Sequence, residues 1–74
     1  MDGRQLQAAR VLLGWTQIQT AEAAGVSVTL VKRAEGASQI KASANAIDAI
    51  RAAIEAAGVE FISENGGGAG VRLK

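Results

Sequence analysis

Four closely spaced residues have the side chains with the clearest chemical potential: Val28, Thr29, Lys32 and Arg33. On a helical wheel of about 100° per residue, we expect them on one arc, opposite an apolar arc of Leu30, Val31 and Ala34. An arginine can donate two hydrogen bonds to guanine, and the methyl groups of valine and threonine can contact a thymine methyl group. A lysine can neutralise a phosphate or reach a base edge. The arc therefore suits the major groove of double-stranded DNA, although a simple solvated face is the alternative, because charged outer faces are common on helices.

Other kinds of chemistry have little support. The chain has no cysteine and no histidine, which excludes disulfides, cysteine nucleophiles, histidine bases and the usual zinc sites. The carboxylates of Glu22, Asp48 and Glu55 form no evident pair. The glycine run at 66–68 lacks the lysine and the strand–loop–helix context of a phosphate-binding loop. We therefore expect a protein that is not an enzyme and that holds no metal or cofactor.

The composition predicts one small domain with a thin core. The chain has 74 residues, of which 49% are hydrophobic, but sixteen of these are alanine, which buries little area. A domain of this size buries only about 60% of the surface of its unfolded chain. We therefore expect a second subunit to share the burial. No apolar run reaches the roughly 20 residues of a membrane span, and no signal-peptide pattern opens the chain, so we expect a cytoplasmic protein.

Glycine and polar clusters divide the chain into four segments of helical length. We expect helices from residue 2 or 3 to 13, from 16 to 24, from 27 to 35, and from 43 or 45 to 57. Thr16 is a good N-cap for the second segment, with Gln19 in capping-box position, and Ser27 is a good N-cap for the third. The second and third helices are very short and flank Gly25. Such helices are unstable alone, and their pairing around a tight turn is typical of a helix-turn-helix.

The hydrophobic period changes after Gly58. Residues 59–62 and 71–74 alternate as strands do, and residues 63–70 join them as a glycine-rich connector. We divide the chain into a helix-turn-helix domain, 1–58, and a C-terminal hairpin extension, 59–74. The apolar Val59, Phe61 and Ile62 either cover the fourth helix or form a dimer contact, and our hypothesis is that the hairpin strands contribute to a twofold interface.

Residues 5–36 resemble the Cro-repressor-type (XRE) helix-turn-helix family, which includes the lambda repressor. The most specific matches are Trp15-Thr16-Gln17, Ala21 and Ala24-Gly25-Val26-Ser27. The likeness continues through the fourth helix to Phe61, and residues 58–73 are similar to small stand-alone bacterial members. The resemblance implies a mainly α fold, namely a four-helix lambda-repressor-like helix-turn-helix domain with a short C-terminal β-hairpin.

The resemblance also implies roles for matching residues. Gln17 occupies a position that contacts the DNA backbone, and the backbone amides at that helix start face a phosphate. The implied DNA-binding set is Thr16, Gln17, Ser27, Val28, Thr29, Lys32 and Arg33. Arg10 and Glu35 occupy positions that form an ion pair between the first and third helices, the alternative being two independent surface charges. Thr20 and Ala34 depart from the family, which has bulkier residues there, so the contact between the two short helices is expected to be loose.

Two further residues leave alternatives open. Trp15 could stack on a base, but a tryptophan between two helices more often closes the edge of a core. Arg4, at the start of the first helix, could touch a phosphate or be an ordinary solvated arginine.

The charge distribution favours the same side of the molecule. The net charge is only +1, but residues 27–41 carry three cations and one acid, whereas residues 42–60 carry one cation and three acids. We therefore expect a sequence-specific DNA-binding transcriptional regulator, working at the nucleoid as a homodimer on a palindromic operator. The alternative is an interaction module of the antitoxin or anti-activator type.

Overall fold

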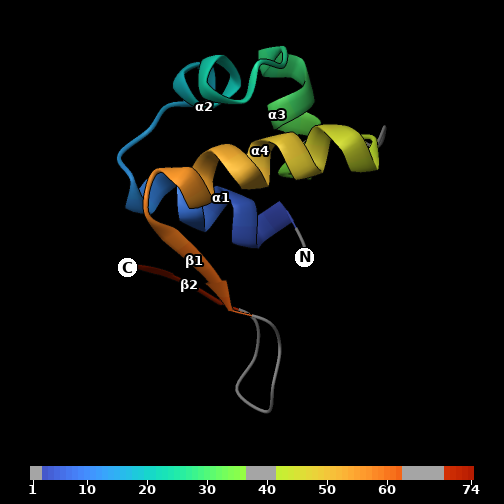
Figure 1. The fold of residues 1–74 in the computed structure, drawn as a ribbon. Helices are drawn as coiled ribbons and strands as arrows, with labels where there is room; N and C mark the ends of the chain where they lie inside the picture. The colour runs from blue at the N-terminus through green and yellow to red at the C-terminus, as the bar shows by residue number, and fades with distance from the viewer. Residues whose placement is uncertain (1–2, 37–41, 63–69) are drawn as a thin grey trace.

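The computed structural model describes residues 3–36, 42–62 and 70–74. Four helices and two strands follow one another along these segments: α1 (Gly3–Leu12), α2 (Gln17–Ala24), α3 (Val28–Ala34), α4 (Ala44–Ala56), β1 (Val59–Ile62) and β2 (Gly70–Leu73). The helix α4 lies beside α1, with α2 and α3 on one side of this pair and the hairpin on the other (Figure 1). The mainly helical fold with a short C-terminal hairpin is therefore confirmed. Residues 63–69 of the expected connector 63–70, the break at 37–41 with Lys41, and the possible helix start at Asp2 lie outside the described residues. Gly70 belongs to β2, so this strand covers Gly70–Leu73 and not the expected residues 71–74.

Helix α2 begins and ends as its sequence predicts. The Thr16 hydroxyl accepts a hydrogen bond from the Gln19 amide at 3.0 Å, and the Gln19 side chain accepts one from the Thr16 amide at 2.8 Å. This reciprocal pair is a complete capping box. Gly25 ends the helix in the left-handed conformation, with φ of 69°, a backbone shape that glycine adopts without steric cost.

Serine side chains begin the next two helices. The Ser27 hydroxyl accepts from the amide of Leu30, and the Ser43 hydroxyl accepts from the amide of Ala46, both at 3.2 Å. Helix α4 therefore starts under a Ser43 cap, which settles the choice between Ser43 and Asn45. A capped start matters most for α3, because seven residues form too few internal hydrogen bonds to be stable alone.

The core is small and is shared by helices and hairpin. Among the described residues, four of the nine buried hydrophobic side chains are alanines, so the thin core expected from the composition is present. The largest fully buried apolar side chains come from α1, α3, α4 and β1: Leu6, Val31, Ile50, Ile54 and Val59. Val59 lies in the same cluster as the helical residues, so the hairpin contributes to the core rather than standing apart from it.

Thr20 and Ala34 are both buried. The Thr20 hydroxyl donates to the Thr16 carbonyl at 3.0 Å. This bond satisfies a hydroxyl that would otherwise be costly to bury. Trp15 packs against the core cluster, as predicted for a tryptophan at the edge of a core.

The hairpin is antiparallel, with Val59 opposite Leu73 and Ile62 opposite Gly70. One side chain of α1 ties its far end to the helices, because the buried Gln5 amide donates to the carbonyls of Ile62 and Gly70 at 3.0 Å each. Phe61 packs on the core, so the expectation that hairpin residues cover the fourth helix holds for this side chain. The Arg51 guanidinium of α4 lies 5.6 Å from the centre of its ring.

Replacing Gln5 with leucine tests this tie. We expect Gln5→Leu to lower the free energy of unfolding by about 1–2 kcal/mol, because two carbonyls lose a donor inside the protein. Relative to the unaltered protein, amide hydrogen exchange in the variant should become faster in the hairpin than it does in α4. Asn45→Leu, which replaces an exposed amide on α4, is the control and should leave hairpin exchange unchanged. Equal protection of the hairpin in both variants would contradict the role of Gln5.

None of the helices in the described segments is long and apolar enough to cross a lipid bilayer.

Candidate nucleic-acid interface

Helices α2 and α3 meet at the turn around Gly25, and both rest on α4. The turn is held by the Val26 amide, which donates to the Ala21 carbonyl at 3.1 Å. Neither helix could persist alone at this length. Their shared contact with α4 therefore fixes how α3 is presented at the surface.

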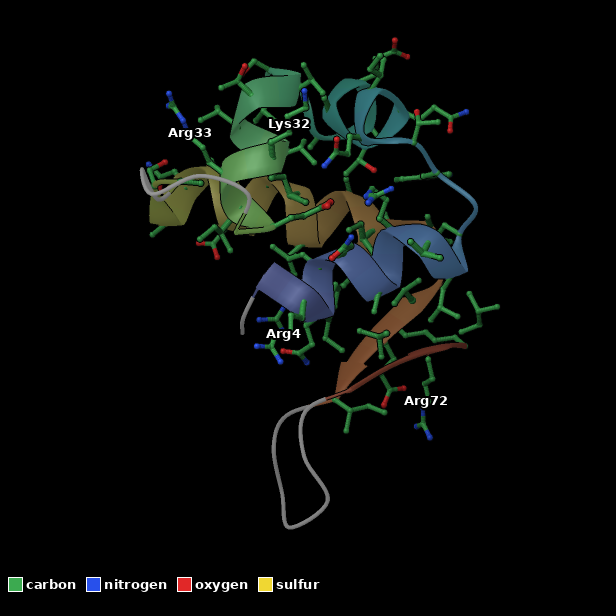
Figure 2. The ribbon with its side chains drawn as sticks, turned by 180° about the vertical axis from the view of Figure 1, so that it is seen from behind. Arg4, Lys32, Arg33 and Arg72 are labelled. Atoms are coloured by element: carbon green, nitrogen blue, oxygen red, sulfur yellow. The ribbon has the colours of Figure 1, made fainter. Side chains whose placement is uncertain are left out.

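Helix α3 has one buried face and one exposed face. Val31 and Ala34 are buried in the core, whereas Thr29 and Lys32 are exposed and Arg33 is half-buried. Figure 2 shows the Arg33 side chain extending away from the ribbon of α3. The structure thus brings Thr29, Lys32 and Arg33 together on the outer side of one helix.

Val28 is placed differently from the expectation. It was expected on the outer arc, but it is half-buried and packs against the core cluster. At about 100° per residue, Val28 lies only about 60° from Val31, so it sits at the boundary between the two faces. Leu30, expected on the inner arc, is also half-buried. The outer face is therefore narrower than predicted, and Val28 forms its edge.

A shallow groove of about 270 Å³ lies between the start of α2 and α3. Its lining consists of Thr16, Gln17, Ile18, Val28 and Lys32. Ile18 is 60% exposed and was not among the residues predicted to contact DNA. Its position directly after Gln17, at an outward-facing place in the first turn of α2, is the signal that could have found it. The groove offers two aliphatic side chains beside a cation.

An ion pair connects α1 to the C-terminal end of α3. The Arg10 guanidinium donates to the Glu35 carboxylate through Nε at 2.7 Å and through a second nitrogen at 3.1 Å. Arg10 also donates to the Trp15 carbonyl at 3.1 Å. The two charged side chains are only 13% and 5% exposed. The pair expected between the first and third helices is therefore present, and it is bidentate and nearly buried.

Gln17 joins the same network. Gln17 is half-buried, and its side-chain nitrogen donates to Glu35 Oε1 at 3.2 Å. This hydrogen bond connects the start of α2 to the end of α3. A primary amide carries two N–H groups, so the second one can still donate to an outside acceptor. The capping hydroxyls of Thr16 and Ser27 are in a similar position, because each oxygen accepts a backbone hydrogen bond while its own hydrogen can still donate.

The electrostatics of the α3 surface follow from this network. Glu35 is turned inward and neutralised by Arg10, so it does not offset the cations outside. Helix α3 itself carries Lys32 and Arg33 and no acidic residue. The exposed side of this helix is therefore positively charged.

Protein-family models give no match to this chain, and a search of curated protein sequences finds no similar protein.

Arg4 lies apart from the group on α3. It is exposed at the start of α1 (Figure 2) and lines a different groove, between α1 and β2.

Proposed function

We propose that this protein is a sequence-specific, double-stranded DNA-binding transcriptional regulator that acts as a homodimer in the cytoplasm, at the nucleoid. Helix α3 would enter the major groove in each half-site of a palindromic operator, with half-sites about one helical turn, or roughly 34 Å, apart. In this proposal the protein has no catalytic activity and uses no cofactor.

One observation supports the proposal more strongly than the others. A seven-residue helix, held by a capped turn and a helix beneath it, buries its valine and alanine while offering Thr29, Lys32 and Arg33 outward. A hydroxyl with a methyl group, a flexible cation and a forked cation are the groups that read base edges and phosphates. The start of α2 adds Thr16 and Gln17 next to this face, where helix N-termini favour phosphate oxygens.

Selection of bound duplexes from a random pool tests the proposal directly. The expected result is a palindromic motif whose halves are centred about one helical turn apart. Binding to the selected duplex should weaken steeply with added salt, because each neutralised phosphate releases counterions. Failure to enrich any motif, together with a stable protein partner that co-purifies, would instead favour the interaction-module alternative.

Arg33 provides the sharpest single test of base reading. We expect Arg33→Ala to cost about 1–3 kcal/mol of binding free energy at the selected site and to relax preference at one base pair, because two hydrogen bonds to guanine are lost. Fluorescence anisotropy on the selected duplex and on single-base variants measures this. Arg72→Ala removes the same charge from the hairpin at the opposite end of the molecule (Figure 2), and should leave affinity and preference nearly unchanged. Equal losses on every sequence would assign Arg33 to a phosphate contact.

A further inference from the structure

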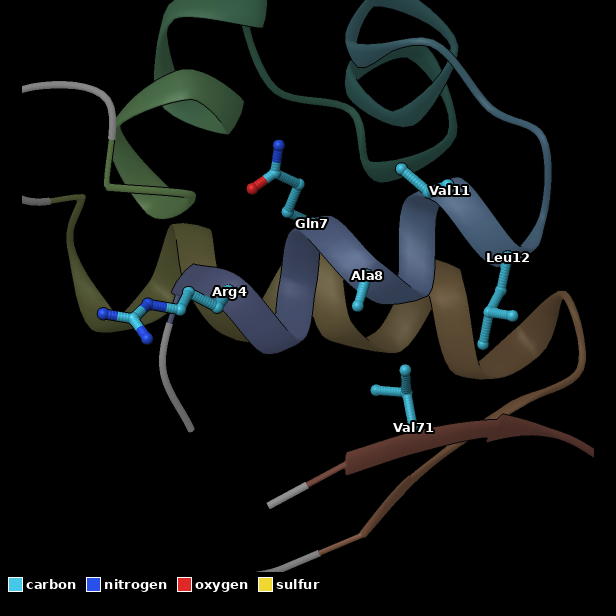
Figure 3. A pocket seen from close by; sticks show the side chains of 6 residues that line it. All are labelled: Arg4, Gln7, Ala8, Val11, Leu12 and Val71. Carbon is cyan, nitrogen blue, oxygen red and sulfur yellow. The ribbon is translucent and has the colours of Figure 1, made fainter. Parts of the chain in front are cut away.

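A second groove, larger than the one beside α3, runs between α1 and β2 (Figure 3). It has a volume of about 620 Å³. Its lining comes from both elements: Arg4, Gln7, Ala8, Val11, Leu12 and Val71. The proposed DNA contacts use none of these residues, so this face is free when α3 is engaged.

Apolar side chains on the two elements that form the groove are not buried. In the lining, Val11 is 62% exposed and Leu12 is 43% exposed, and Leu73, two residues after Val71 on β2, is 56% exposed. Ala8 is small and exposed in the middle of the helix, directly above Val71 in Figure 3. A helix face with a short residue at its centre allows another helix to approach closely. A domain with so thin a core also gains most from sharing such surface with a partner.

The position of Arg4 indicates what that partner is. Arg4 lies in the first turn of α1, which contains no acidic residue, and a cation is unfavourable near the positive end of its own helix. Arg4 and Leu12 lie four residues before and four residues after Ala8. If a second α1 lies antiparallel with Ala8 at the twofold axis, each Arg4 meets the Leu12 end of the other helix. That end carries the negative pole of the helix dipole, so each misplaced cation gains a favourable neighbour.

We infer that the groove between α1 and β2 is the seat of a second copy of this chain, packed with the two α1 helices antiparallel about a twofold axis. The inference deepens the proposed dimeric regulator and rests on it for the twofold symmetry of the assembly. No residue of α3 lines the groove, so this arrangement places no α3 side chain in the groove.

Two matched substitutions test the interface. Val11 and Ile18 are β-branched, exposed to 62% and 60%, and lie on different helices, with only Val11 in the groove. Light scattering after size exclusion should show a dimer for the unaltered chain and for Ile18→Glu, and a monomer for Val11→Glu. Circular dichroism should show the same helix content in all three. Two results would overturn the inference. One is a Val11→Glu chain that stays dimeric. The other is an unaltered chain that is monomeric, whether it is alone or has a different protein bound in the groove. Truncation before Val59 is a poorer test because it removes a core residue.

Arg4→Glu tests the antiparallel arrangement separately. The dimer dissociation constant should rise by at least about ten-fold, because two symmetric contacts with helix C-termini turn repulsive. Helix content of the monomer should not fall, since glutamate suits the first turn of α1. An unchanged dissociation constant would contradict the antiparallel arrangement.

The DNA-binding proposal fails or stands independently of the interface. If Val11→Glu and the unaltered chain are both dimeric and both bind the selected duplex, the interface is wrong and the function stands. If Val11→Glu is monomeric but the unaltered dimer selects no sequence, the interface is right and the function is wrong.

Discussion

Replacing Arg10 with methionine should lower the free energy of unfolding by about 3–5 kcal/mol, because it leaves the nearly buried Glu35 carboxylate without its counter-charge. A domain of this length is expected to have a total of only about 4–11 kcal/mol, so the variant should be partly unfolded near physiological temperature. Urea titration followed by the fluorescence of Trp15, the one tryptophan of the chain, measures the loss.

A double substitution separates the value of the pair from the penalty of breaking it. Arg10→Met with Glu35→Leu removes both charges and keeps apolar volume, so it should be clearly more stable than Arg10→Met alone. The Gln17 amide loses its partner in this variant, so full recovery is not expected. A loss below about 1 kcal/mol in the single variant would mean that the pair behaves like a solvated surface ion pair.

Adding a single methyl group at Gly3 should also be costly. A Cβ built there would lie 2.6 Å from the Glu35 carbonyl carbon and 2.8 Å from the Ala34 carbonyl oxygen. These are backbone atoms at the end of α3, so α1 must move away from α3. We expect Gly3→Ala to lower the free energy of unfolding by about 2–3 kcal/mol through overpacking, in spite of the better helix propensity of alanine.

Gly70→Ala is the matched control for this change. A Cβ at Gly70 meets nothing within 4 Å, and alanine loses less backbone freedom than glycine in a strand. Gly70→Ala should therefore be neutral or slightly stabilising in the same urea titration. Similar unfolding free energies for the two variants would show that α1 and α3 can separate at this point without cost.

Local sequence signals predicted the helices well because caps act over three or four residues. Thr16 with Gln19, and Ser27, stand at helix starts where the sequence placed them. Arg10 and Glu35 are 25 positions apart in the sequence. Their ion pair was predicted from the family resemblance and not from any local pattern.

The parts of the site that were not predicted depend on tertiary contacts. Val28, about 60° from Val31 around the helix, packs against the core cluster because the core covers α3 as far as this edge. Ile18 is exposed and lines the same groove as Val28. The hydrogen bonds from Gln5 to the hairpin join residues 57 and 65 positions apart in the sequence. No local pattern around a glutamine at the polar start of a helix predicts such distant partners.

The network that joins Arg10, Glu35 and Gln17 has a consequence for ionic strength. Mobile ions screen exposed charges strongly and nearly buried pairs much less. In the proposed complex with DNA, sodium chloride should therefore weaken the contacts of Lys32 and Arg33 at concentrations that leave the contact between α2 and α3 intact. If concentrated salt released that complex, α3 would keep its conformation and could bind again on dilution.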